Sequence, residues 1–165
     1  MSNKSLPSGT SAGMSLTDEA IARTHILALI HRYASLAREE SDYSMITELF
    51  EKDGIINFPD GRQLAPNQLK EIAGGNPPKL LRHHITTIDV QLVSLDEAHS
   101  QSYIIAGTHM RMPDHWGRWD DVLKRQSDGR WLFQRKTIMA EQIDPEGWLA
   151  ETINLAASAN KNERE

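Results

Sequence analysis

The sequence predicts an α+β fold in which helices come first and a curved antiparallel sheet follows. Apolar residues recur at helical spacing near the N-terminus, and long strand-like segments begin near residue 80. Turn signals separate these segments, and the sharpest is Ser127-Asp128-Gly129. Because long twisted strands curl, we expect helices packed on the concave side of the sheet to enclose a pocket.

The first half of the chain is predicted to be mainly helical. Ser15 or Thr17 can cap a first helix, whose apolar stripe comprises Ile26, Leu27, Ile30, Tyr33, Ala34 and Ala37. Asp42 can cap a short second helix, and a short strand is expected over residues 55–58. Pro66 is suited to the first position of a third helix, which ends at Gly74-Gly75.

The second half is predicted to contain four strands and a final helix. The strands are expected at about 81–94, 98–112, 116–126 and 130–142. Pro145 can open the final helix. We therefore predict one domain over residues 15–158, between a disordered leader (1–14) and a disordered polar tail (159–165).

Composition excludes several classes of function. The net charge of -5 over 165 residues offers no basic surface for nucleic acid or an anionic membrane. No apolar run approaches the roughly 20 residues that span a bilayer. The absence of cysteine excludes thiolate metal sites and is compatible with the cytoplasmic location that we predict. Phosphate-binding glycine loops, His-Glu-x-x-His and nucleophile-elbow motifs are also missing, so we predict no cofactor and no metal.

The most chemically specific feature is the pair His83-His84 at the start of the strand expected at 81–94. Neighbouring strand side chains point to opposite faces, so one of the two histidines should face inward. An imidazole there could gain or lose a proton near neutral pH. A structural histidine that bonds a neighbouring group is the alternative interpretation.

A series of short segments occurs in a characteristic order. They are Arg32-Tyr33-Ala34, Asp42-Tyr43, Glu48-Leu49-Phe50, Asp53-Gly54, Arg82-His83-His84, Asp96-Glu97-Ala98, Gly117-Arg118 and the run from Asp128 to Arg135. Together they resemble the nuclear transport factor 2-like superfamily, in its SnoaL-like and scytalone dehydratase-like branch, over about residues 16–142. The resemblance implies a cone-like α+β barrel whose sheet wraps around the N-terminal helices. It also implies a small hydrophobic substrate and a histidine–carboxylate acid–base pair.

The resemblance implies roles for particular residues. His83 falls at the position of the catalytic histidine, and Glu39 replaces the aspartate that partners it, with Glu40 and Asp42 as alternatives. His109 matches a second pocket histidine. Strict alternation, however, groups His84 with the more apolar face of its strand, so we expect a polar-lined pocket or a β-bulge if His83 points inward.

Other candidates have a structural interpretation beside the functional one. Tyr33 could polarise a substrate oxygen or be a core residue. Arg135 should share a face with Trp131 and Phe133, where it could bind an anion or form a salt bridge. Asp120 and Asp121 are further possible partners for a histidine. The remaining histidines are interpreted as surface or packing residues: His25, His31, His99 and His115.

We therefore predict a cofactor-independent lyase or isomerase: a dehydratase, cyclase or double-bond isomerase acting on a small polyketide-, steroid- or aromatic-type substrate. The alternative is a non-catalytic ligand-binding or interaction domain, and in either case we expect a homodimer or higher homo-oligomer formed through the sheet. Its aromatic contacts would come from Trp116, Trp119 and Trp131. A structural subunit of a ring-hydroxylating dioxygenase ranks third. A closed apolar cavity holding a histidine–carboxylate pair would favour the enzyme, whereas a filled or shallow one would favour the binding domain.

Overall fold

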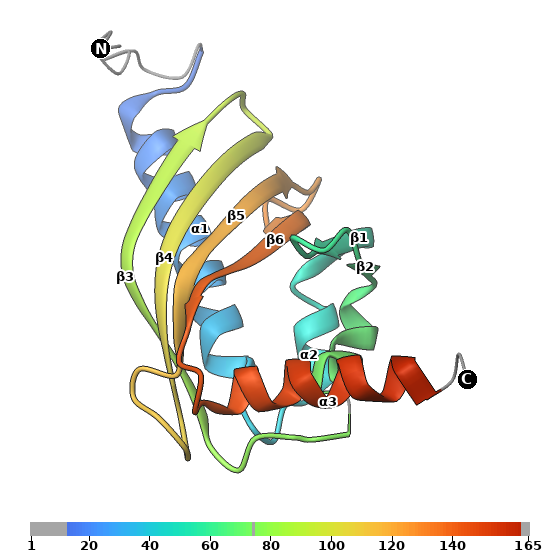
Figure 1. Ribbon diagram of the computed structural model, residues 1–165. Helices are drawn as coiled ribbons and strands as arrows, with labels where there is room; N and C mark the ends of the chain where they lie inside the picture. The colour runs from blue at the N-terminus through green and yellow to red at the C-terminus, as the bar shows by residue number, and fades with distance from the viewer. Residues whose placement is uncertain (1–12, 74, 163–165) are drawn as a thin grey trace, which may run out of the picture.

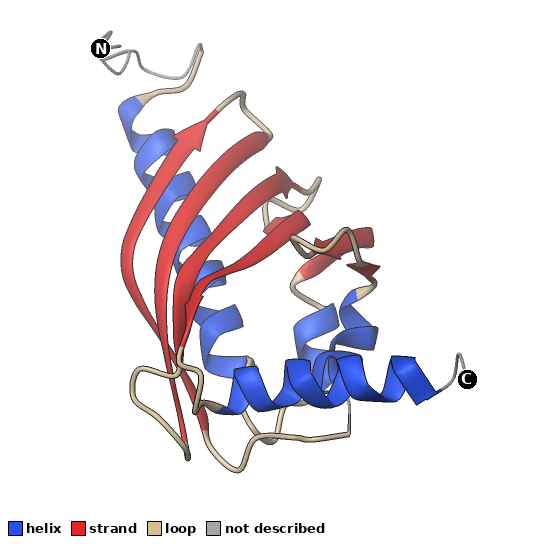
Figure 2. Cartoon of the chain, in the orientation of Figure 1, coloured by secondary structure: helices blue, strands red, loops and turns tan. Residues whose placement is uncertain are grey.

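The computed structural model describes residues 13–73 and 75–162, and its centre is one curved, six-stranded sheet. The predicted α+β fold is confirmed, with helices first and a sheet that does not close on itself (Figures 1 and 2). The sheet order is β2-β1-β6-β5-β4-β3. The strands are β1 (Phe50–Asn57), β2 (Gln63–Leu64), β3 (Leu81–Leu92), β4 (Glu97–Thr108), β5 (His115–Arg125) and β6 (Trp131–Ile143).

The four long strands form the predicted antiparallel meander, and the sheet is extended by a parallel pair. β3, β4, β5 and β6 pair in sequence order as antiparallel neighbours. β1 then pairs with β6 in parallel, and β2 pairs with β1 at the edge. The whole sheet is therefore mixed, although its four long strands are antiparallel.

The first helix, α1 (Leu16–Leu36), crosses the concave side of the sheet (Figure 1). Ser15 is its N-cap, because the Ser15 hydroxyl oxygen accepts the Asp18 amide at 3.1 Å. Ile26, Ile30 and Tyr33 are buried along one stripe, as the spacing predicts. Burial of this stripe fixes the direction in which α1 delivers its C-terminal end to the start of β3.

Shorter helices follow. Asp42 caps α2 (Tyr43–Thr47) by accepting the Ser44 amide at 3.0 Å, as predicted. The helix expected from Pro66 is a 3-10 helix, η1 (Pro66–Ala73). The final helix, α3 (Trp148–Asn162), extends past residue 159, where the tail was expected to begin. Residues 1–12 of the predicted leader and residues 163–165 of the tail lie outside the described residues.

A β-bulge in β3 decides which of the paired histidines faces inward. The register of β3 against β4 shifts between Ile85 and Thr87. The extra residue reverses the alternation, so His83 and Ile85 lie on the same face as the buried Val90. His83 is consequently half-buried and His84 is exposed. The bulge is one of the two arrangements expected from the sequence for an inward His83.

A second bulge changes the inner face of β6. Phe133 pairs with Leu123, but Arg135 pairs with the adjacent Val122, so one residue of β6 is extra. Lys136 is fully buried as a result, and Arg135 is exposed. The prediction that Arg135 shares a face with Trp131 and Phe133 is therefore wrong, because the bulge interrupts the alternation between them.

An aromatic cluster fills the centre of the cone. The Tyr33 ring lies 5.1 Å from Trp119, 5.9 Å from Phe133 and 6.2 Å from Phe50, all between centroids and all edge-to-face. The Lys136 ammonium lies 4.4 to 4.5 Å from the rings of Tyr33, Trp119 and Phe133. Among the helices within residues 13–73 and 75–162, none is long and apolar enough to cross a membrane.

Candidate functional site

His83 forms a hydrogen bond to the C-terminal end of α1. Its Nδ1 lies 2.9 Å from the carbonyl oxygen of Ala37, the C-cap residue of the helix. The last carbonyls of a helix have no partner within the helix, so this hydrogen bond satisfies one of them. A carbonyl can only accept, so His83 donates from Nδ1. When the ring is neutral, its Nε2 therefore carries a lone pair.

The surroundings of His83 keep the ring neutral. Its centroid lies 5.4 Å from the Trp119 ring and 6.0 Å from the His115 ring. Burial, followed by repulsion from His115, lowers the pKa of His83 to about 4, although the bond to Ala37 opposes the shift. At neutral pH, His83 is thus an uncharged imidazole, and its hydrogen bond within the described residues uses Nδ1, so Nε2 carries the lone pair.

His115 is held by the preceding residue, Asp114. His115 donates from Nδ1 to the Asp114 carboxylate at 2.8 Å, and both residues are buried. Asp114 also accepts the Thr108 hydroxyl at 2.8 Å and the Trp148 and Leu149 amides at 2.6 and 3.3 Å. Burial raises the pKa of Asp114, but these hydrogen bonds outweigh it and lower the pKa, so the carboxylate is ionised at neutral pH. We call His83, His115 and Asp114 the rim site.

Sequence reasoning missed two of the three residues of the rim site. His115 was interpreted as a surface or packing residue, and Asp114, which lies between the strands expected at 98–112 and 116–126, was given no role. The Asp-His dipeptide gives no local signal, because its partners come from β4 and from α3. A carboxylate beside a histidine at the start of a predicted inner strand is the pattern that could have identified the pair.

Glu39, the predicted partner of His83, lies elsewhere. Its carboxylate forms an ion pair with Arg82 and accepts the Leu81 amide at 3.0 Å. The hydrogen bond from Arg82 is the main reason that the pKa of Glu39 falls to about 2. Within the part of the chain that the structure describes, Glu39 makes no hydrogen bond to His83. It anchors the beginning of the strand that carries His83.

The other predicted residues do not join His83. Tyr33 is buried in the aromatic cluster, where Trp119 contacts both its ring and the ring of His83. β4 ends at Thr108, so His109 lies in the following turn, where its exposed ring accepts the Lys79 amide at 3.3 Å. Asp42 acts as a helix cap. His84 and Arg135 are exposed on the outer face.

A buried ion pair between Lys136 and Asp121 was also missed. The Lys136 ammonium donates to both carboxylate oxygens of Asp121 at 2.9 Å, and neither side chain is exposed. Desolvation lowers the pKa of Lys136 and raises that of Asp121, whereas their mutual attraction opposes both shifts. Asp121 was considered as a partner for a histidine, but its partner is Lys136.

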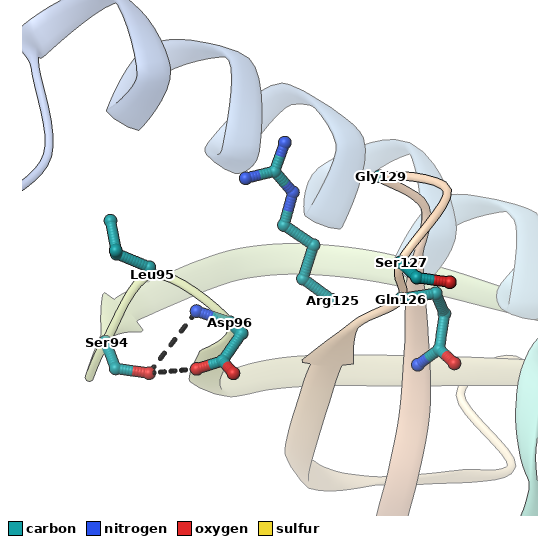
Figure 3. A pocket seen from close by; sticks show the side chains of 7 residues that line it. All are labelled: Ser94, Leu95, Asp96, Arg125, Gln126, Ser127 and Gly129. Atoms are coloured by element: carbon teal, nitrogen blue, oxygen red, sulfur yellow. Dashed lines mark hydrogen bonds between the residues drawn. The ribbon is translucent and has the colours of Figure 1, made fainter.

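Two hollows of the surface lie away from the rim site. One, of about 730 Å³, is open and lies between the β3–β4 and β5–β6 turns (Figure 3); its lining is Ser94, Leu95, Asp96, Arg125, Gln126, Ser127 and Gly129. Another, of about 460 Å³, lies along the N-terminal half of α1. No three His, Asp or Glu side chains within residues 13–73 and 75–162 are grouped as metal ligands.

Comparison with known families agrees with this architecture. Residues 18–137 match the sequence model of the SnoaL-like domain. The chain belongs to the SnoaL-like family. The match covers α1 and most of the sheet, including His83, His115 and Lys136. A search of curated proteins gives no significant match for this SnoaL-like chain.

Several solved structures share the fold. A candidate scytalone dehydratase from Novosphingobium aromaticivorans superposes with a TM-score of 0.68 at 19% identity, covering 79% of this chain and 91% of that chain. Hexachlorocyclohexane dehydrochlorinase LinA-type3 from Novosphingobium barchaimii gives 0.67 at 12% identity, covering 79% and 93%. ActVI-ORFA from Streptomyces coelicolor gives 0.61 at 17% identity, covering 73% and 97%. At these identities the comparison establishes the shared cone fold, and not a shared reaction.

Proposed function

We propose that this SnoaL-like domain is a cofactor-independent lyase or isomerase in which His83 abstracts a proton from carbon. One observation carries the proposal: the hydrogen bond from His83 Nδ1 to Ala37 leaves a neutral ring with a free Nε2. A general base needs both a correct protonation state and a fixed direction. Neighbours of the same fold named as a dehydrochlorinase and a candidate dehydratase support elimination as the reaction class.

The substrate would be small and largely apolar, of the polyketide, steroid or aromatic type. The centre of the cone is filled by Tyr33, Trp119 and Phe133, so the substrate would bind against the exposed edge of His83. Glu39 would act indirectly, by fixing the start of β3 through Arg82 and Leu81. Tyr33 and His109 have no part in this mechanism, because Tyr33 is buried in the aromatic cluster and His109 lies beyond the end of β4.

The experiment compares wild-type protein, His83→Gln and His99→Gln on three probes. Hexachlorocyclohexane and scytalone represent the reactions in the neighbours' names, and 5-nitrobenzisoxazole reports deprotonation of carbon in general. We expect His83→Gln to lower the rate by about 10²–10⁴-fold, the usual contribution of a positioned proton-transfer group. His99, which is exposed and contacts Glu97 on the other face, serves as the matched control and should leave the rate unchanged.

Circular dichroism would establish that both variants are folded. A His83→Gln variant with the wild-type rate would overturn the role of His83. A wild-type protein that accelerates none of the three reactions above buffer would overturn the proposed enzyme class.

The filled centre of the cone also favours a second candidate, a homodimeric interaction domain. Trp119 and Trp131 are buried inside, so they cannot serve the predicted interface. Trp116 and Tyr103, on adjacent strands, are 39% and 47% exposed on the outer face and offer apolar surface in their place. Sedimentation equilibrium at micromolar concentration should give the mass of two chains for wild type and of one chain for Trp116→Glu. A single-chain mass for wild type would count against the dimer.

A further inference from the structure

We infer that His115 is a second catalytic residue, the general acid that accompanies the base His83, and that Asp114 positions it. The inference rests on the proposed function, because it needs His83 to take a proton from the same molecule. It assigns the rim site two histidines with different tasks, in place of a histidine and a carboxylate from the end of α1.

The sheet brings the two imidazoles together. His83 on β3 pairs with Ala106 on β4, and Ala106 pairs with His115 on β5, so all three residues lie in one row. Ala106 is fully buried and contributes only a methyl group between the two strands. The two rings therefore meet edge to face, with centroids 6.0 Å apart and an interplanar angle of 71°. Both rings could contact one small molecule at this separation.

The two rings are held by different acceptors. Each donates from Nδ1, His83 to a neutral carbonyl and His115 to the ionised carboxylate of Asp114. Each therefore keeps Nε2 available for chemistry. A carboxylate stabilises an imidazolium, whereas burial against a carbonyl favours the neutral ring. His83 is accordingly suited to accept a proton, and His115 to donate one.

We expect this pair to remove water from a compound that carries a carbonyl group and a β-hydroxyl group. The His83 Nε2 lone pair takes the proton from the carbon next to a carbonyl group, and the C–H electron pair becomes the new carbon–carbon double bond. The bond to the β-hydroxyl breaks, and its electron pair leaves on oxygen. In this step His115 starts as the imidazolium, with hydrogen on both ring nitrogens and the Asp114 carboxylate beside Nδ1. The departing oxygen takes its Nε2 proton and leaves as water. His83 is left protonated and His115 neutral, and exchange of one proton with solvent at each ring restores both.

Asp114 ties the general acid to two neighbouring elements. The same carboxylate accepts the Thr108 hydroxyl from β4 and the first amides of α3, from Trp148 and Leu149. These donors hold the carboxylate in place without using His115. Asp114 is thus a positioning residue, because it acts on the reaction through the orientation and tautomer of His115.

The role of His115 can be tested with two substrates that differ in their leaving group. Opening of 5-nitrobenzisoxazole releases a stable phenolate and needs no acid, whereas dehydration of 4-hydroxy-4-phenylbutan-2-one must expel hydroxide. We expect His115→Gln to lower the dehydration rate by about 10²-fold or more, the scale of one proton-transfer group, and to leave benzisoxazole opening nearly unchanged. His83→Gln should lower both reactions, and the control His99→Gln neither.

The outcomes separate the two proposals. If His83→Gln abolishes benzisoxazole opening but His115→Gln dehydrates the hydroxy ketone like wild type, His115 is not the acid and the proposed function survives. A wild-type protein that opens the benzisoxazole without dehydrating the hydroxy ketone also counts against His115. If neither wild-type reaction exceeds buffer, the proposed function fails and this inference fails with it.

Asp114→Asn tests the positioning role, with Thr108→Val as its matched control. Both variants remove a hydrogen-bonding group at the same buried carboxylate, but only the first alters the acceptor of His115. Asp114→Asn should lower dehydration, spare benzisoxazole opening and change the ¹⁵N shifts that report which nitrogen of His115 carries hydrogen. Thr108→Val should leave the ratio of the two rates and the shifts unchanged. If the two variants gave the same rate ratio and the same ¹⁵N shifts, Asp114 would have only a structural role.

Discussion

The rim site and the buried ion pair lie on the same concave face, yet they leave very different chemistry available. Lys136 donates to both oxygens of Asp121 and is surrounded by three aromatic rings, so neither charge remains free for a ligand. His83 and His115 each use one nitrogen for anchoring and retain the other. The number of atoms already engaged in hydrogen bonds therefore separates polar groups that stabilise the fold from polar groups that could act on a substrate.

The largest effect on stability should come from breaking the buried ion pair. Lys136→Met leaves Asp121 buried without a partner, which should lower the free energy of unfolding by about 3–5 kcal/mol. Chemical denaturation would measure the loss, and adding Asp121→Leu to Lys136→Met should restore most of it. Arg135→Ala, at the exposed neighbouring position, should change stability by less than about 0.5 kcal/mol. Equal stability of Lys136→Met and Arg135→Ala would show that the ion pair contributes nothing.

The rim site should instead appear in the pH dependence of stability. The folded-state pKa of His83, about 4, lies below the ordinary value of 6.5, so the unfolded chain binds a proton first as the pH falls. Stability should therefore fall between pH 6.5 and pH 4, by roughly 3 kcal/mol at 1.36 kcal/mol per pH unit. Denaturation of His83→Gln across this range should show a smaller loss than wild type, with His99→Gln following wild type. Parallel curves for all three proteins would contradict the shifted pKa.

The smallest effect should come from the carboxylate first expected to partner His83. Glu39→Gln removes a partly exposed ion pair with Arg82, so we expect a loss of less than about 1 kcal/mol in unfolding free energy. Its rate on 5-nitrobenzisoxazole should remain far above that of His83→Gln, because Ala37 continues to hold the imidazole. A rate as low as that of His83→Gln would make Glu39 the essential partner after all.

Sequence reasoning predicted the features that depend on local signals. The caps at Ser15 and Asp42, the buried stripe of α1 and the hairpin at Asp128-Gly129 all follow from residues that are close in the chain. The inward position of His83 came from the family resemblance, and it agreed with the local alternation only if the pocket was polar-lined or the strand contained a β-bulge, which the structure shows. The family resemblance supplied the cone shape.

The rest depends on contacts that no local pattern specifies. A single extra residue between Phe133 and Arg135 exchanged the inner and outer faces of β6, and nothing in that segment marks it. The carbonyl that orients His83 belongs to the backbone of Ala37, so no residue type in the sequence could have predicted this contact. The acid–base partner expected at Glu39 was inferred by analogy, whereas the structure places a carboxylate and a histidine together at Asp114 and His115.

Because His83 is held by the Ala37 carbonyl, the site depends on the direction in which the last turn of α1 points that carbonyl. Each residue of an α-helix advances its end by about 1.5 Å and turns it by about 100°. One alanine inserted between Tyr33 and Ala37 would therefore swing the terminal carbonyl away from His83, although composition would barely change. The same insertion ahead of Ser15 would leave that carbonyl where it is. The number of residues between Tyr33 and the end of the helix therefore determines the orientation of His83, as directly as a side chain that contacts it.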